Sequence, residues 1–220
     1  MKNRFINTNF RLVLASTSPR RRSISIEFFS EIVFATPDID ERRASPRESV
    51  KGLVSSLSLQ KARSLAKPKD GNVFLAADTL VVSNGKILGK PENAQNAKEM
   101  LEHLRGRKHK VVSSVTVFDN KTGSWASTVN TSEVAMRLYS DDEISEYVES
   151  GESMDKAGAY AIQDEKFRFA SLLTGCYLNV VGLPLCSVTE LFRRLGIQLR
   201  IRKNWPARIK CDDCLLISYH

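Results

Sequence analysis

Two short apolar segments of this chain each run into a polar turn, and this arrangement limits the folds that the chain can adopt. Residues 12–15 read Leu-Val-Leu-Ala and continue into Ser-Thr-Ser-Pro-Arg-Arg, and residues 73–76 continue into Ala77, Asp78 and Thr79. A short apolar run bounded by turn residues is typical of a buried strand. In open α/β sheets, ligands bind where such strands end. We therefore expect an α/β fold with a binding site at these two turns.

Strands and helices alternate in the first part of the chain. Ser18 followed by Pro19 is a strong helix start, because serine caps free amide groups and proline suits the first helical position. The predicted helix runs to about residue 29. A strand over residues 31–36 follows, and a capping box at residues 45–48, Ser-Pro-Arg-Glu, opens a second helix that runs to about residue 66.

Hairpins replace this alternation in the second part of the chain. The apolar run over 73–78 predicts a strand that ends at Asp78, and residues 80–88 fold back at Asn-Gly, a dipeptide favoured in tight turns. Residues 109–119 and 124–137 predict a second antiparallel pair. Helices over 93–105, from Ser140 to Gly151 and up to Gly196, and a strand around 167–170, complete the predicted elements. The sheet is therefore expected to be mixed and elongated, with flanking helices.

The composition is that of a globular chain with one domain or two closely packed lobes. Of the 220 residues, 42% are hydrophobic and 26% are charged, which suffices for a sizeable core. No apolar run approaches the roughly 18 residues that a membrane helix needs. The apolar stretch at residues 12–15 is far shorter than that of a secretory signal. We expect no membrane partner and a cytoplasmic location.

The net charge of +8 is concentrated at the two ends. Residues 1–22 and 198–220 carry the excess of lysine and arginine, whereas the body between them is nearly neutral. A nearly neutral body is not typical of a protein that grips nucleic acid over its whole surface. Cys211 and Cys214 have the spacing of metal ligands, but no second close pair completes a zinc site. Solvated surface charge and a frayed end remain open interpretations of this tail.

The first polar turn places cations and hydroxyls at a helix start. Arg20 and Arg21 would lie at the helix N-terminus, which already favours anions, and guanidinium groups add paired donors to phosphate. Ser16 and Ser18 add hydroxyl donors. The alternative is an ordinary capped helix with exposed arginines.

The second turn and an acidic segment offer carboxylates. Asp78 follows an apolar run, so we expect it to be partly desolvated and to have a metal ion, a cation or a proton as its partner. Glu41 could join it in holding Mg²⁺, which prefers a few carboxylates together with substrate phosphates and water. A turn-capping aspartate and a solvated acidic turn are the alternatives.

Two lysines complete the candidate residues. Lys61 continues the buried-face spacing of Leu53 and Leu57, so its ammonium group reaches either a cleft or, by snorkelling, the surface. Lys90 stands between glycine and proline in a loop that lacks the glycine spacing of a Walker motif, but it can still act as a point charge for phosphate. A carboxylate together with a group of cations suits hydrolysis of a nucleoside polyphosphate.

These segments together resemble the Maf-like nucleoside triphosphate pyrophosphatases, over about residues 12–196. The segments that carry the resemblance are Leu-Ala-Ser-Thr-Ser-Pro-Arg-Arg at 14–21, Asp-Ile-Asp-Glu at 38–41, Gln-Lys-Ala at 60–62, Ala-Asp-Thr at 77–79, Gly-Lys-Pro at 89–91, Gly-Arg-Lys-His at 106–109, Asp-Lys-Ala-Gly-Ala-Tyr-Ala-Ile-Gln at 155–163 and Val-Gly-Leu-Pro at 181–184. The resemblance implies an elongated fold similar to inosine triphosphate pyrophosphatases, with two lobes around a cleft. It also implies a divalent metal, Mg²⁺ or Mn²⁺, and a homodimer.

The resemblance implies roles for individual residues as well. Asp78 would be the proton acceptor for the attacking water and, with Glu41, a metal ligand. The residues implied to bind substrate are Ser16, Ser18, Arg20, Arg21, Lys61, Thr79, Lys90 and Gln163. Positions matching Arg20, Thr79 and Gln163 are associated with base choice. Thr79, together with the segment at 155–163, resembles the branch that prefers dTTP and UTP, as opposed to the branch that acts on 7-methyl-GTP. Ala161 and Asp164 stand where family members commonly have glycine.

The implied organisation is an N-terminal extension at 1–10, a Maf-like catalytic domain at 11–197 and a basic tail at 198–220. The expected reaction converts a nucleoside triphosphate, here dTTP or UTP, to the monophosphate and pyrophosphate. A pyrophosphatase for modified nucleotides such as 7-methyl-GTP is one alternative. The other is a regulator without enzymatic activity that binds nucleotides or nucleic acid, although such a protein has no need of a carboxylate aimed at phosphate.

Overall fold

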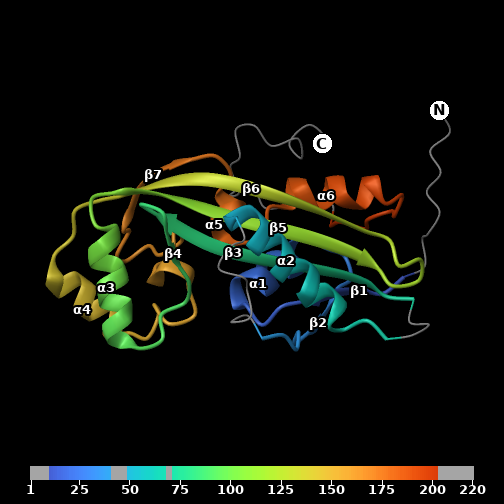
Figure 1. Ribbon diagram of the computed structural model, residues 1–220, viewed down its shortest axis with the longest axis horizontal. Coiled ribbons are helices and arrows are strands. Elements are labelled where there is room, and N and C mark those ends of the chain that lie inside the picture. Colours follow the sequence, from blue (N-terminus) through green and yellow to red (C-terminus); the bar gives the residue numbers. More distant parts are fainter. Residues whose placement is uncertain (1–9, 41–48, 68–70, 203–220) are drawn as a thin grey trace.

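One elongated sheet runs through the whole molecule and joins two lobes (Figure 1). The structure is a computed structural model and describes residues 10–40, 49–67 and 71–202. Its strands are β1 (Leu12–Ala15), β2 (Val33–Ala35), β3 (Val73–Ser83), β4 (Lys86–Leu88), β5 (Lys108–Asp119), β6 (Trp125–Met136) and β7 (Ala170–Thr174). Its helices are α1 (Pro19–Phe28), α2 (Val50–Arg63), α3 (Ala94–Leu104), α4 (Asp141–Glu149), the 3-10 turn η2 (Ala157–Ala159), α5 (Tyr177–Val181) and α6 (Leu185–Arg194).

The sheet is mixed, as the element order predicts. Its strands are arranged β2-β1-β3-β5-β6-β7, and β4 also pairs with β3. Strand β1 is parallel to both β2 and β3, whereas all other pairs are antiparallel. The parallel part comes from the strand–helix alternation of the first 80 residues, and the antiparallel part comes from the two hairpins.

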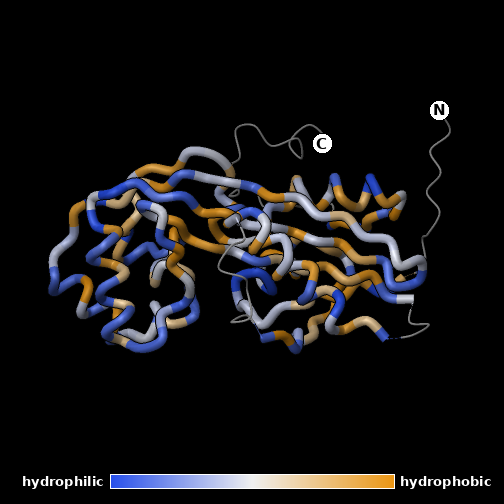
Figure 2. Tube along the Cα trace, viewed as in Figure 1, coloured by the Kyte–Doolittle hydropathy of each residue, from blue (hydrophilic) through white to orange (hydrophobic). Residues whose placement is uncertain are grey.

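Helices cover both faces of the sheet in the larger lobe. Side chains of β3 alternate between the faces, so that Leu75 and Ala77 join the core under α1, α5 and α6, whereas Phe74 and Ala76 join the core under α2. Figure 2 shows apolar and polar residues interspersed along α6. Its buried residues Leu185, Val188 and Leu191 recur every three positions, which gives the helix one apolar face. A three-layer arrangement of helix, sheet and helix follows.

The smaller lobe is built at the far end of the long strands. Helices α3 and α4 pack there with the segment that leads into β7 (Figure 1). Its core is aromatic: Tyr147 has no exposed surface and contacts the rings of Phe167 and Phe169 edge-on, with centroids 5.0 Å apart in both pairs. Ser140 begins α4 with a complete capping box, which confirms the predicted helix start.

Two predicted strands need correction, and one predicted helix start lies outside the described residues. Strand β3 does not end at Asp78 but continues to Ser83, because the apolar residues after Thr79 go on pairing with β5. The last strand is Ala170–Thr174 rather than 167–170, since Phe167 and Phe169 are buried in the smaller lobe. Helix α2 begins at Val50 with Ser49 as its cap, and the predicted capping box at residues 45–48 lies outside the described residues.

In the described part of the chain, no helix is both long and apolar enough to span a membrane. Residues near the predicted start of the tail are held against the larger lobe: the amide of Arg202 donates to the carbonyl of Phe28 at 2.9 Å, and the amide of Ser30 donates to the carbonyl of Arg200 at 3.1 Å. The division at residues 10 and 197 stays a prediction.

Candidate active site

A gap in the edge of β3 marks the place where the lobes meet. Strand β1 pairs with Val73–Ala76 of β3 by register, and β4 pairs with 81–83 on the same edge. Among the described strands, residues 77–80 therefore have only β5 as a neighbour. A cleft of about 430 Å³ opens at this gap, within the usual size of small-molecule sites. The residues predicted to form the site that line the cleft are Ser16, Ser18, Arg20, Arg21, Lys61, Asp78, Thr79, Lys90 and Gln163.

The turn after β1 places the N-terminal end of α1 at this cleft. Ser18 caps the helix, its hydroxyl accepting from the amide of Arg21 at 3.5 Å, and Pro19 occupies the first turn. The hydroxyl of Ser16 accepts from the amide of Ser18 at 3.1 Å, which tightens the turn. The N-terminal end of a ten-residue helix with two arginines therefore faces the cleft, an arrangement that favours anions.

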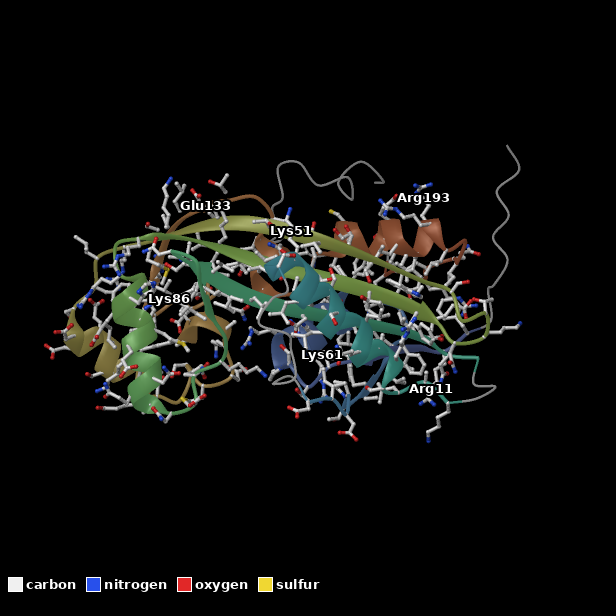
Figure 3. All side chains as sticks on the ribbon, in the orientation of Figure 1. Arg11, Lys51, Lys61, Lys86, Glu133 and Arg193 are labelled. Carbon is white, nitrogen blue, oxygen red and sulfur yellow. The ribbon has the colours of Figure 1, made fainter. Side chains whose placement is uncertain are left out.

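Asp78 and Lys61 form a buried ion pair on one face of the sheet. Asp78 lies in the middle of β3, and the Nζ atom of Lys61, from the last turn of α2, donates to its Oδ1. Each side chain is only 8% exposed. Figure 3 labels Lys61 near the middle of the long axis. The predicted alternative of a snorkelling lysine is wrong, because the ammonium group is turned toward the cleft and the carboxylate.

Thr79 and Arg21 meet on the opposite face. The Nη2 atom of Arg21 donates to Oγ1 of Thr79 at 2.9 Å, and its Nε atom donates to the carbonyl of Gly182 at 2.9 Å. A Cβ atom at Gly182, whose φ is +109°, would lie 3.1 Å from Thr79 Oγ1 and 3.2 Å from Arg21 Nε. Glycine is therefore required where α5 ends, both for the left-handed backbone and for the space that Arg21 occupies.

Arg20 crosses the cleft from the larger lobe to the smaller one. Its Nη1 atom donates to the carboxylate of Asp155 at 2.7 Å, and its Nη2 atom donates to the carbonyl of the same residue at 3.0 Å. Lys156, which is buried, also pairs with Asp155 at 2.8 Å. Burial alone would raise the pKa of Asp155, but the hydrogen bond from Lys156 and the charge of Arg20 outweigh it and lower that pKa. Asp155 therefore stays ionised and holds both cations at the cleft.

The turn that carries these residues approaches β3 closely. Gly158 has a φ of +71°, and a Cβ atom there would lie 3.2 Å from the side chain of Val81. The amide of Gly158 donates to the carbonyl of Gly89 at 3.0 Å, which ties the loop of Lys90 to this turn. Two loops far apart in the sequence thus form one wall of the cleft.

Residues 11–195 match the family described as Maf-like protein. The chain belongs to the Maf-like family. Among its relatives is a dTTP/UTP pyrophosphatase of Dehalococcoides mccartyi, 38% identical over 207 residues that cover 92% of this chain and 90% of that protein. A dTTP/UTP pyrophosphatase of Dictyoglomus turgidum is 38% identical over 188 residues, covering 86% and 97%. One of Clostridium botulinum is 35% identical over 191 residues, covering 86% and 98%.

The cleft of this Maf-like protein contains one predicted metal ligand among the described residues. Asp78 lines it, whereas Glu41 lies outside the described residues; its neighbours Pro37 and Ile39 line the cleft. In the described ranges, no three His, Cys, Asp or Glu side chains are grouped as metal ligands. Lys90 and Gln163 are exposed at the rim.

The sequence interpretation gave no role to two charged residues of the Maf-like cleft. Asp155 and Lys156 appear in the segment that carries the family resemblance, but were not predicted as site residues. Their signal in the sequence is weak, because an Asp-Lys pair after a helix is typical of a solvated turn. Only the fold shows that Lys156 is buried and that Asp155 faces Arg20 across the cleft.

A buried histidine behind the cleft wall gives a test of the folded state. Nε2 of His109, on β5, lies 2.7 Å from the hydroxyl of Tyr160, which lines the cleft. Burial lowers the pKa of His109 to about 4, so the unfolded chain, with a histidine pKa of about 6.5, binds a proton first on acidification. The stability that neutral His109 contributes is therefore fully present above pH 6.5 and is lost as the pH falls toward 4.

Because of this histidine, we expect the free energy of unfolding to be about 2 kcal/mol lower at pH 5 than at pH 7. Urea denaturation at both pH values measures the loss. In His109→Gln, whose amide can still bond to the hydroxyl of Tyr160, the loss should shrink by that amount. An equal loss in both proteins would contradict the assignment.

Proposed function

We propose that this chain hydrolyses dTTP and UTP to the nucleoside monophosphate and pyrophosphate. The observation that carries the proposal is that Asp78 and the cations Arg20, Arg21, Lys61 and Lys90 line one cleft between the lobes. A triphosphate needs its charge neutralised while a carboxylate activates water, and this cleft offers both. The three relatives above, each a dTTP/UTP pyrophosphatase by name, support the same reaction and substrates.

The cations bind the phosphate chain from different sides of the cleft. Arg20 and Arg21 bind phosphate oxygens at the N-terminus of α1, where the helix dipole also favours negative charge. Lys90 reaches the chain from the opposite rim as a point charge. Since these groups stand on different elements, the phosphates are fixed in position before the reaction, which lowers the entropic part of the barrier.

Asp78 is the group that we assign to the water. Its Oδ1 atom accepts a hydrogen bond from Nζ of Lys61, which orients the carboxylate. The carboxylate accepts a proton from water as the water oxygen forms a bond to the α-phosphorus, and the bond from that phosphorus to the oxygen of the departing pyrophosphate breaks. The positive groups at the cleft neutralise the charge that the pyrophosphate carries away.

A divalent cation fits this donor set. Mg²⁺ is bound in proteins by one or two carboxylates, with substrate phosphates and water completing its shell, and the described cleft supplies Asp78, a carboxylate whose second oxygen has no hydrogen bond among the described residues. Asp78 would hold the ion together with Glu41. When bound, the ion would supply charge neutralisation and orientation of the phosphates.

The part of the cleft lined by residues 161–163 suits the base. Gln163 and Ile162 line the cleft there, and Thr79 lines it from β3. A glutamine amide offers both a donor and an acceptor to the edge of thymine or uracil, and a pocket built for such pairing leaves polar groups unpaired when another base enters. The preference for dTTP and UTP is therefore an effect of hydrogen-bond pairing.

The proposal is tested by measuring pyrophosphate release from dTTP, UTP, CTP, 7-methyl-GTP and ITP, with Mg²⁺ or Mn²⁺ and with EDTA. We expect release from dTTP and UTP to exceed that from the other three by about tenfold or more. Chelation should lower it by at least about 100-fold, and added metal should restore it. Preferred release from 7-methyl-GTP would favour the alternative branch. No release from any nucleotide, with salt-dependent binding to DNA, would contradict the enzymatic proposal.

A further inference from the structure

We propose that Ser113, a residue outside the cleft, sets the base preference by fixing the direction in which the hydroxyl of Thr79 points. The inference rests on the proposed pyrimidine triphosphate substrate and adds a positioning residue to it. Ser113 lies on β5 directly opposite Thr79 in the register. Its side chain has no exposed surface and does not line the cleft, so it would act only through Thr79.

The direction of each hydrogen bond in this group follows from counting hydrogens. Ser113 Oγ lies 2.8 Å from the carbonyl of Asn179 and 2.9 Å from Oγ1 of Thr79. A carbonyl can only accept, so the single hydroxyl hydrogen of Ser113 goes to Asn179. Ser113 must then accept from Thr79, which uses the only hydrogen of the Thr79 hydroxyl.

The carbonyl of Asn179 needs this donor. Helix α5 has five residues and ends at Gly182, and the amides of Gly182 and Leu183 both donate to Leu178, at 2.9 and 2.8 Å. Asn179 is buried, and an unpaired buried carbonyl carries a large desolvation cost. The Ser113 hydroxyl therefore stays turned toward Asn179, and the direction of the whole group is fixed.

Arg21 closes the other side of Thr79. Its Nη2 atom donates to Thr79 Oγ1 at 2.9 Å, so one lone pair of that oxygen is used and one remains. Thr79 can offer a ligand in the cleft an acceptor and no hydrogen.

This polarity distinguishes the pyrimidine bases. The pairing edge of thymine or uracil has a single donor, N3–H, between two carbonyl oxygens, so a hydroxyl that can only accept must pair with N3–H. Cytosine in the same position turns a lone pair of N3 toward the lone pair of Thr79, which is repulsive. Without Ser113, the hydroxyl of Thr79 is free to turn and donate to N3 of cytosine.

The test measures binding, so that it does not depend on turnover. Dissociation constants for the α,β-imido analogues of dUTP and dCTP are obtained by calorimetry for the wild type and for Ser113→Ala. We expect the preference of the wild type for dUTP to fall about tenfold in the variant, through weaker dUTP binding and stronger dCTP binding. Ser113→Cys, which nearly keeps the side-chain volume and has a weaker donor, should shift the ratio in the same direction by less.

Ser127→Ala is the matched control. The variant also loses a hydroxyl hydrogen bond, because Ser127, a partly buried residue on β6, lies 2.6 Å from Oγ1 of Thr116. Ser127 does not line the cleft, so the ratio of the two dissociation constants in this variant should equal that of the wild type. Thermal denaturation identifies which Ser113 variants are folded. An unchanged ratio in a folded variant, or a wild type that binds both analogues equally, overturns the inference. Pyrophosphate release from dTTP by the wild type reports separately on the proposed function.

Discussion

Replacing Asp78 with asparagine should lower kcat for pyrophosphate release from dTTP by about 10³-fold or more. The amide cannot take a proton from water at neutral pH and is a poor ligand for a divalent cation, so both roles that we assign to this side chain are lost together. The shape of the side chain is kept, and the amide oxygen can still accept from Lys61. We therefore expect the variant to fold and to bind triphosphate.

Two measurements distinguish a loss of catalysis from a loss of folding or of substrate binding. Circular dichroism and thermal denaturation should show a folded Asp78→Asn protein with a lower melting temperature, and a titration with an α,β-imido analogue should show that it still binds. Asp119→Asn is the control, since Asp119 ends the partner strand β5, is buried as a residue to the same extent as Asp78, and does not line the cleft. Near-normal pyrophosphate release by the Asp78 variant would remove that residue from the mechanism.

Lys61→Met should affect both stability and activity. Methionine keeps the length of the side chain but leaves the carboxylate of Asp78, which is 8% exposed, without its cation. Breaking one side of a buried ion pair typically costs about 3–5 kcal/mol, which urea denaturation would detect. Without the ammonium group the carboxylate is also free to turn away from the substrate, and we expect kcat/KM for dTTP to fall by about 100-fold or more.

The double variant, Lys61→Met with Asp78→Asn, separates these two effects. Since it buries no uncompensated charge, it should recover most of the stability that Lys61→Met loses, while its activity remains as low as that of Asp78→Asn. A loss of stability that equals the sum of the single losses would show that the two side chains do not interact. Recovery of activity in the double variant would contradict the role of the carboxylate.

The elements around the cleft were largely predictable, because their signals are local. Ser18 and Pro19 begin α1, Ser140 begins α4 and the Asn84-Gly85 turn joins β3 to β4, since caps and tight turns depend on residues a few positions apart. The helical spacing of Lys61 with Leu57 also placed this residue on the buried face of its helix, but left open whether its ammonium group reaches a cleft or the surface. Its partner could not be predicted, because 17 residues separate Lys61 from Asp78.

The sequence predictions were wrong or incomplete where tertiary packing determines the extent of a strand or the partner of a side chain. Asp78 interrupts an apolar run, which indicates the end of a strand, but the long partner strand β5 and the cation on α2 keep it inside β3. Arg20 and Asp155 are 135 residues apart, and nothing in either local sequence indicates that they meet. The hydrogen bonds from Thr79 to Ser113 and from Ser113 to the carbonyl of Asn179 depend on the register of β3 with β5 and on where α5 ends, neither of which the sequence specifies locally.

The three long strands that pass from one lobe into the other restrict how the molecule can move. Many two-lobed enzymes close on substrate by rotating about a thin hinge, but β3, β5 and β6 form a continuous hydrogen-bonded plate across the junction. Bending the sheet at the junction would break many backbone hydrogen bonds at once. One contact between the lobes that can change without disturbing the sheet is the ion pair of Arg20 and Asp155, whose side chains are 18% and 45% exposed. A triphosphate bound at the start of α1 would compete with that carboxylate for the guanidinium of Arg20, so substrate binding would alter this side-chain contact and leave the sheet unchanged.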